Sequence, residues 1–124
     1  MGKRNSKLSV HLTERALKDI EAISAWSVES FGQKVADAYI GKLEAALKRI
    51  QENPNLLRTQ EKFHSTLQFY RMERHLLVCE TSIDQRIIVL TVVHESMDLL
   101  ARLSEWEPTL QAELAILLAK LKRK

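Results

Sequence analysis

Residues 87–93 read Ile-Ile-Val-Leu-Thr-Val-Val, which is the longest strongly apolar stretch of the chain. Successive side chains of a strand point to opposite faces of its sheet, and here both alternating sets are apolar. A strand of that kind must be covered on both sides, so the stretch predicts the central strand of a sheet. It is far too short to cross a bilayer.

Two more strands are expected directly before this stretch. Residues 67–71 and 75–80 are rich in apolar and aromatic side chains. The segments that separate the three strands, 72–74 and 82–85, have the length of hairpin connections. The three strands therefore predict an antiparallel meander.

A strand and a long helix are predicted at the other end of the chain. Residues 7–12 alternate apolar and polar side chains, as a half-buried strand does. Thr13 then has the side chain of a helix N-cap. An apolar stripe at helical spacing runs to Phe31, where Gly32 can end the helix; the stripe consists of Leu17, Ile20, Ile23 and Trp26.

A second helix follows almost at once and ends at Asn53-Pro54. Its stripe consists of Val35, Ala36, Tyr39, Ile40, Leu43, Leu47 and Ile50. Two long helices with so short a connection form an antiparallel hairpin, and both need a sheet on which to bury their stripes. We interpret Trp26 and Tyr39, which lie on or near these stripes, as core residues.

Two C-terminal helices are expected, one over residues 97–103 and one that starts near Pro108. The second carries a stripe of leucines and ends in basic residues, with Trp106 between the two helices. It can pack on the open face of the sheet, or it can dimerise or engage a partner helix. The fold class is thus α+β: an N-terminal strand and a helical hairpin packed on a mainly antiparallel β-sheet (β-α-α-β-β-β), with C-terminal helices.

Bulk composition narrows the classes of function. The 124 residues fit one domain, with 7–103 as its core and 104–124 as a C-terminal extension. The net charge of +3 is compatible with an acidic partner but does not require nucleic acid.

Cys79 is the single cysteine, which suits a reducing cytosol and predicts a buried thiol. The four histidines have no paired ligand spacing, so we expect neither a metal nor a cofactor.

This order of elements resembles the ParE/RelE toxin superfamily, and particularly its ParE branch of the plasmid-stabilisation type. The resemblance covers residues 7–103. The matching segments are the strand-to-helix opening at residues 13–20, the helix at 42–50 with its Asn53-Pro54 stop, the strand pair at 69–78, and the closing strand 88–93 followed by His94 and Asp98. The family often carries glycine at the first hairpin, whereas residues 55–74 contain none.

The resemblance implies a cytoplasmic toxin of a bacterial type II toxin–antitoxin system that is not an enzyme. Members of the ParE branch bind DNA gyrase and stall it with cleaved DNA, and a ParD-like antitoxin neutralises them. Two alternatives stay open: a RelE-like ribosome-dependent mRNA endoribonuclease, and a degenerate member that is no longer toxic. Either a homodimer or a toxin–antitoxin hetero-oligomer would fit, without sequence-specific binding of nucleic acid and without a membrane.

The residues that we expect to contact a partner or target are Arg58, Arg71, Arg74 and His94, and no residue is assigned as catalytic. They are cationic or polar and lie beside apolar strands. In the nuclease alternative, Lys62 and Tyr70 would join them. Tyr70 and Arg71 are successive residues of one strand, so their side chains point to opposite faces and the whole set cannot converge. For His94 we favour a structural role, with a hydrogen bond to a backbone group or to Asp98.

Overall fold

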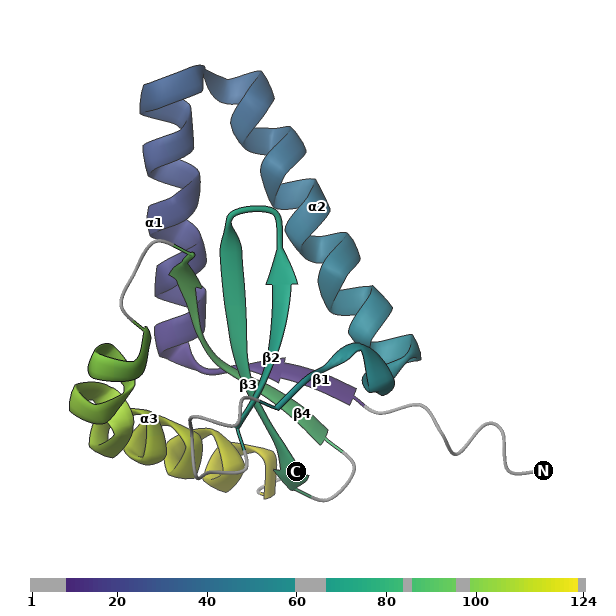
Figure 1. The fold of residues 1–124 in the computed structure, drawn as a ribbon, viewed down its shortest axis with the longest axis vertical. Helices are drawn as coiled ribbons and strands as arrows, with labels where there is room; N and C mark the ends of the chain where they lie inside the picture. The colour runs from purple at the N-terminus through teal and green to yellow at the C-terminus, as the bar shows by residue number, and fades with distance from the viewer. Residues whose placement is uncertain (1–8, 60–66, 84–85, 96–98, 123–124) are drawn as a thin grey trace.

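The computed structural model describes residues 9–59, 67–83, 86–95 and 99–122 (Figure 1). A helical hairpin lies on one side of a sheet and a C-terminal helix on the other. The elements, in chain order, are β1 (Ser9–Leu12), α1 (Glu14–Phe31), α2 (Gln33–Glu52), the short 3-10 helix η2 (Pro54–Leu56), β2 (Leu67–Met72), β3 (His75–Ile83), β4 (Arg86–His94) and α3 (Leu99–Lys122).

The sheet has the strand order β1-β4-β3-β2, and β4 is therefore internal, as its apolar sequence predicts. The strands β2, β3 and β4 form the expected antiparallel meander. The N-terminal strand β1 pairs with β4 in parallel, which makes the sheet mixed and mainly antiparallel. Outside β2, Arg58 forms an isolated antiparallel bridge with Phe69.

A β-bulge in β4 determines which of its side chains face each layer. Val78 pairs with Thr91 and Cys79 pairs with Val89, so Leu90 is the extra residue on the β4 side. Before the bulge, Val89 packs on the hairpin side and Leu90 on the α3 side. After it, Val92 again faces the hairpin, although strict alternation from Val89 would send it to the other face.

The start of α1 is hydrogen-bonded to β4 beyond the end of β1. Thr13 caps α1 by accepting a hydrogen bond from the Ala16 N–H, as predicted. The same hydroxyl donates to the Leu90 carbonyl at 2.9 Å, and the Thr13 N–H donates to the Val89 carbonyl at 3.1 Å. Farther along α1, Asp19 accepts a hydrogen bond from the Val92 N–H at 3.0 Å and another from the Thr91 hydroxyl. The chain thus continues the pairing of β4 after β1 has ended.

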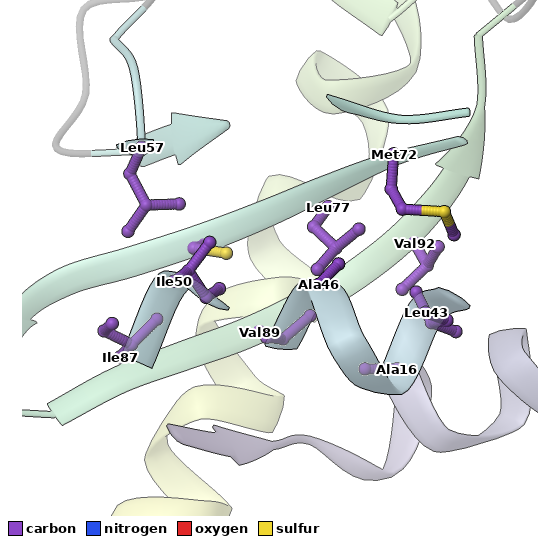
Figure 2. Packing of buried hydrophobic residues seen from close by; sticks show 11 residues of the cluster. Ala16, Leu43, Ala46, Ile50, Leu57, Met72, Leu77, Ile87, Val89 and Val92 are labelled. Atoms are coloured by element: carbon purple, nitrogen blue, oxygen red, sulfur yellow. The ribbon is translucent and has the colours of Figure 1, made fainter. Parts of the chain in front are cut away.

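The main core lies between the helical hairpin and the sheet (Figure 2). Leu43, Ala46 and Ile50 of α2 pack there against Leu77 of β3 and Val89 of β4. Buried Leu110 and Leu114 of α3 cover the opposite face of the sheet, on which Leu67, Phe69, Val78, Ile88, Leu90 and Val93 lie. Of the two predicted fates of the C-terminal helix, the structure shows packing on the sheet.

The C-terminal region corrects one detail of the prediction. A single helix, α3, runs from Leu99 to Lys122, where we expected two, and Pro108 lies inside it. Proline has no N–H and its ring clashes with the preceding turn, which bends a helix without necessarily ending it. Figure 1 shows that the helix changes direction between its green first part and its yellow-green second part. Among the described helices, none is long and apolar enough to cross a membrane.

The β2–β3 turn shows how the chain manages without the glycine that the family often has there. Glu73 takes a positive φ of 57° in this turn, a conformation that glycine adopts more easily. Its carboxylate lies 3.6 Å from the Lys42 ammonium of α2. The turn is therefore tied to the helical hairpin by a surface ion pair.

Candidate functional site

Three of the four predicted contact residues lie at one end of the sheet. Arg71 is in β2, Arg74 is in the turn to β3, and His94 is the last residue of β4, where it pairs with His75. Arg58 lies farther along the outer edge, opposite Phe69, and its side chain is exposed. The structure therefore brings Arg71, Arg74 and His94 to one end and places Arg58 beside the edge strand.

Glu95, which the sequence reasoning missed, joins the two arginines of this end. Arg71 Nη2 donates a hydrogen bond to Glu95 Oε1, and Arg74 Nη1 lies 3.8 Å from Glu95 Oε2. The Glu95 N–H donates to the Arg74 carbonyl at 2.8 Å, which holds the carboxylate beside the turn. The signal in the sequence was an acidic residue directly after the strand end, but its partners come from β2 and from the turn.

The side chains of Tyr70 and Arg71 point to opposite faces, as the alternation predicts. Tyr70 packs against the core on the hairpin side, and its hydroxyl accepts a hydrogen bond from Arg49 Nη1 of α2 at 2.9 Å. Arg71 instead reaches Glu95 on the other side of the strand. The predicted nuclease set therefore does not converge on one point. Lys62 lies outside the described residues.

A hydrogen-bonded group of Tyr39, His75 and His94 lies on the hairpin face of the same end. Tyr39 Oη accepts a hydrogen bond from the Arg74 N–H at 3.3 Å and lies 2.6 Å from His75 Nδ1. Because the hydroxyl accepts from the backbone, its own proton is available to donate to Nδ1. Tyr39 of α2 is thereby hydrogen-bonded both to the turn before β3 and to the first residue of β3.

The imidazole of His75 is kept neutral by its surroundings. Burial lowers its pKa from the ordinary value of 6.5, and the neighbouring His94 lowers it further, while Glu95 acts in the opposite direction. The ring centroids of His75 and His94 are 5.2 Å apart, in an edge-to-face arrangement. His94 itself is exposed at the strand end. Asp98 lies outside the described residues, so the His94–Asp98 hydrogen bond stays a prediction.

A cleft opens between this group and the tip of the helical hairpin. A cavity of about 380 Å³ is lined by Trp26, Ser27, Phe31, Val35, Tyr39, Glu73, Arg74, His75 and His94. A second cavity, of about 240 Å³, shares Trp26, His75 and His94 with the first and adds Ala22 and Ile23. We call these two cavities together the Trp26 cleft.

The position of Trp26 contradicts its interpretation as a core residue. Its side chain is 58% exposed and packs edge-to-face on Phe31, with ring centroids 5.5 Å apart. The physical reason is the length of the hairpin, whose tip extends beyond the turn between β2 and β3 (Figure 1). An apolar stripe that continues past the sheet has nothing to cover its last turns. Tyr39, by contrast, is partly buried against the core, as expected.

The described residues offer neither a metal site nor a reactive thiol. No group of three or more His, Cys, Asp or Glu side chains among them is placed to hold a metal ion. Cys79 is fully buried, as predicted, and burial raises the pKa of its thiol to about 12. A thiol with so high a pKa is almost never the reactive thiolate. What the site offers is a pair of guanidinium groups, two imidazoles and an exposed apolar cleft.

Two solved structures share this fold, and both come from toxin–antitoxin systems. One chain of the chromosomal ParDE toxin–antitoxin system of P. aeruginosa superposes with a TM-score of 0.63 at 16% identity, over 72% of this chain and 97% of that chain. A chain of the RelBE2 toxin–antitoxin complex of Mycobacterium tuberculosis superposes with a TM-score of 0.51 at 16% identity, over 73% and 94%.

The sequence narrows that class to one family. Residues 10–99 match the profile of the ParE toxin of the type II toxin–antitoxin system parDE. The toxin ParE of Escherichia coli is 27% identical over 94 residues, which cover 76% of this chain and 91% of the relative. The chain therefore belongs to the ParE family of type II toxins. The matched range ends where α3 begins.

Proposed function

We propose that this protein inhibits bacterial growth by binding DNA gyrase, without catalysis of its own, and that a ParD-like antitoxin neutralises it. Membership of the ParE family supports the toxin function. The structural neighbours come from toxin–antitoxin systems, which supports an antitoxin as partner. The observation that carries the non-catalytic mechanism is the Glu95 carboxylate between Arg71 and Arg74.

The alternative is cleavage of RNA, which develops negative charge on a phosphorus centre. Cations that stabilise such a transition state must point at it, and a neighbouring carboxylate weakens them and repels the phosphate. In the described part of the chain, Glu95 is hydrogen-bonded to Arg71 and lies within ion-pair distance of Arg74. The lowered pKa of His75 also makes that imidazole a weak acid catalyst at its site, because it is rarely protonated near neutral pH.

The exposed arginines suit protein contacts better. The Arg71 and Arg74 side chains are 67% and 75% exposed although both lie near Glu95, so a partner carboxylate can reach them. Arg58 pairs with Phe69, and directly opposed residues of two strands share a face, which puts Arg58 on the same side of the sheet as Arg71. Arg58 and Arg71 thus share one side of the edge strand, with Arg74 in the turn at its end, and an acidic antitoxin segment can contact all three.

The mechanism is tested with the purified chain, DNA gyrase and a supercoiled plasmid. We expect plasmid with double-strand breaks to accumulate after detergent and protease treatment, because a stalled gyrase stays covalently attached to cut DNA. Cleavage of messenger RNA on translating ribosomes, with gyrase unaffected, would instead support the endoribonuclease. Tight binding of an antitoxin with neither activity would mark a degenerate member.

The contact residues are tested by replacing Arg58, Arg71 and Arg74 together with glutamate. We expect loss of antitoxin binding or of growth inhibition, because like charges then face the acidic partner. Lys18, Lys48 and Lys120, which are also exposed, are replaced together with glutamate as the control for the same change of net charge. A triple variant that folds and keeps both properties would show that these arginines are not the contact residues.

A further inference from the structure

The tip of the helical hairpin concentrates the exposed apolar surface of the described residues. Trp26, Phe31 and Val35 are 58%, 60% and 50% exposed, and all three line the larger cavity of the Trp26 cleft. The other large apolar side chains of similar exposure, Leu17 and Ile116, lie at a separate cavity between α1 and α3. Large apolar side chains gathered around a hollow are typical of a protein-binding surface, and tryptophan is the most frequent energetic centre of such surfaces.

The floor of the cleft adds a defined hydrogen-bonding preference. His75 and His94 both line the cleft, and a histidine ring carries an N–H donor even when it is neutral. Arg74 also lines the cleft, and its cationic side chain is 75% exposed. An occupant therefore needs oxygen acceptors beside its apolar groups.

The charged groups around the cleft indicate which hydrogen-bond acceptors an occupant should carry. The two carboxylates near the floor are each held by a cation: Glu73 lies 3.6 Å from Lys42, and Glu95 is hydrogen-bonded to Arg71. Arg74 is the more loosely held arginine, at 3.8 Å from Glu95, and it is 75% exposed. The whole chain carries a net charge of +3. The cleft is thus complementary to carboxylates that flank an apolar side chain.

We propose that the toxin binds its cellular target through the Trp26 cleft. The cleft accepts a protein segment of that target in which large apolar side chains lie next to acidic residues. The inference rests on the proposed toxin function. The sheet face opposite the hairpin is closed by Leu110 and Leu114 of α3, whereas nothing in the described part of the chain covers the cleft. A toxin that acts by binding needs an open apolar surface of this kind.

The test uses full-length variants expressed in bacteria, with growth inhibition measured against inducer concentration at matched protein levels. Trp26→Ala should raise the inducer needed for half-inhibition roughly tenfold or more, the loss that follows when a central apolar anchor is truncated. Leu17→Ala and Ile116→Ala, of similar exposure but outside the cleft, should stay within about twofold of the natural chain. Thermal unfolding of each purified variant checks that it is folded.

Charged substitutions of Val35 give a second test. The effect on folding and the effect on target binding rank the glutamate and lysine variants in opposite orders. It lies in the first turn of α2, where the helix dipole favours glutamate over lysine. An acidic target segment reverses this order in the growth assay: Val35→Glu should lose inhibition strongly, and Val35→Lys should keep most of it. A folding defect cannot produce that reversal.

The outcomes distinguish a failure of the cleft assignment from a failure of the proposed toxin function. If the natural chain inhibits growth and Trp26→Ala and Val35→Glu inhibit equally well, the target-binding role of the cleft is wrong and the toxin function stands. Full toxicity of these variants combined with loss of neutralisation by a co-expressed antitoxin would move the cleft to the antitoxin and also overturn the assignment. If the natural chain does not inhibit growth, the proposed function is wrong, and this inference is wrong with it.

Discussion

At the scale of the residue, Asp19 joins the first helix to the central strand. Its carboxylate accepts hydrogen bonds from the Val92 N–H and from the Thr91 hydroxyl, which also accepts one from Arg15 Nε at 3.3 Å. A buried backbone N–H that loses its hydrogen-bond partner destabilises the folded state, because its desolvation is no longer offset by a hydrogen bond. One carboxylate therefore stabilises the stretch of β4 that lies beyond the end of β1.

Asp19→Ala should lower the free energy of unfolding by about 1–3 kcal/mol, because the Val92 N–H and the Thr91 hydroxyl both lose their acceptor. Urea unfolding followed by circular dichroism measures this loss. Asp37→Ala is the matched control, since the exposed Asp37 accepts a hydrogen bond from Gln33 on its own helix. That variant should change stability by at most about 0.5 kcal/mol. Equal effects of the two substitutions would show that the Asp19 link contributes nothing.

His75 predicts a pH dependence of stability in the mildly acidic range. Burial and the neighbouring His94 lower its pKa below the ordinary 6.5, so between these two values the unfolded chain binds more protons than the folded one. The free energy of unfolding is therefore highest above that window and falls as the pH falls through it. Part of this loss should disappear in His75→Asn, whose side-chain oxygen can still accept the Tyr39 hydrogen bond.

The measurement compares urea midpoints at about pH 7.5 and about pH 5.5 for both proteins. Burial and the nearby Arg86 lower the pKa of His11 too, so His11→Asn is measured alongside to separate its share. If the natural chain and His75→Asn lose the same stability over this interval, His75 is not held neutral by the fold.

At the scale of the element, the apolar stretch 87–93 was sufficient to predict a central strand, because burial on both faces needs apolar residues at every position. The bulge in that strand could not be predicted from it. The strand is hydrogen-bonded there to Thr13 and Asp19, which lie more than seventy positions earlier in the chain. The exposure of Trp26 was missed for a related reason: an apolar stripe shows which face of a helix is buried, but not where the sheet beneath it ends.

The prediction of the functional site from the sequence was limited in the same way. Arg71, Arg74 and His94 could be placed at one end of the sheet, since hairpin connections fix which strand ends meet. The role of Glu95 depends on how far two arginine side chains reach across β2 and its turn, and alternation along a strand does not give that. The single helix α3 escaped prediction because Pro108 indicates a helix start as readily as a bend.

The packing of α3 leads to a prediction about its leucines. Leu110→Ala should destabilise the protein by about 2–5 kcal/mol, because Leu110 is 1% exposed against the sheet and its truncation leaves a cavity. Ile116→Ala, on the exposed side of the same helix, should cost far less, about 0.5 kcal/mol. Chemical unfolding of the two variants gives the comparison. Similar small losses would mean that α3 contributes little to the stability of the domain.

At the scale of the whole molecule, one end of the sheet carries two different surfaces. Arg71, Arg74 and Glu95 form a charged surface beside β2, while the Trp26 cleft lies between the same strand ends and the hairpin tip. Arg74 borders both. Two surfaces that share a residue allow an antitoxin at the charged edge to hinder a target at the cleft, which is how a binding toxin can be neutralised without a second conformation.

The most direct test of the toxin mechanism is a pulse-label of DNA synthesis and protein synthesis in bacteria, minutes after this chain is induced alone. A toxin that stalls gyrase on cut DNA should stop DNA synthesis first and induce the DNA-damage response, with protein synthesis falling later. Protein synthesis that stops first, while DNA synthesis continues, would contradict the account and point to cleavage of messenger RNA on the ribosome.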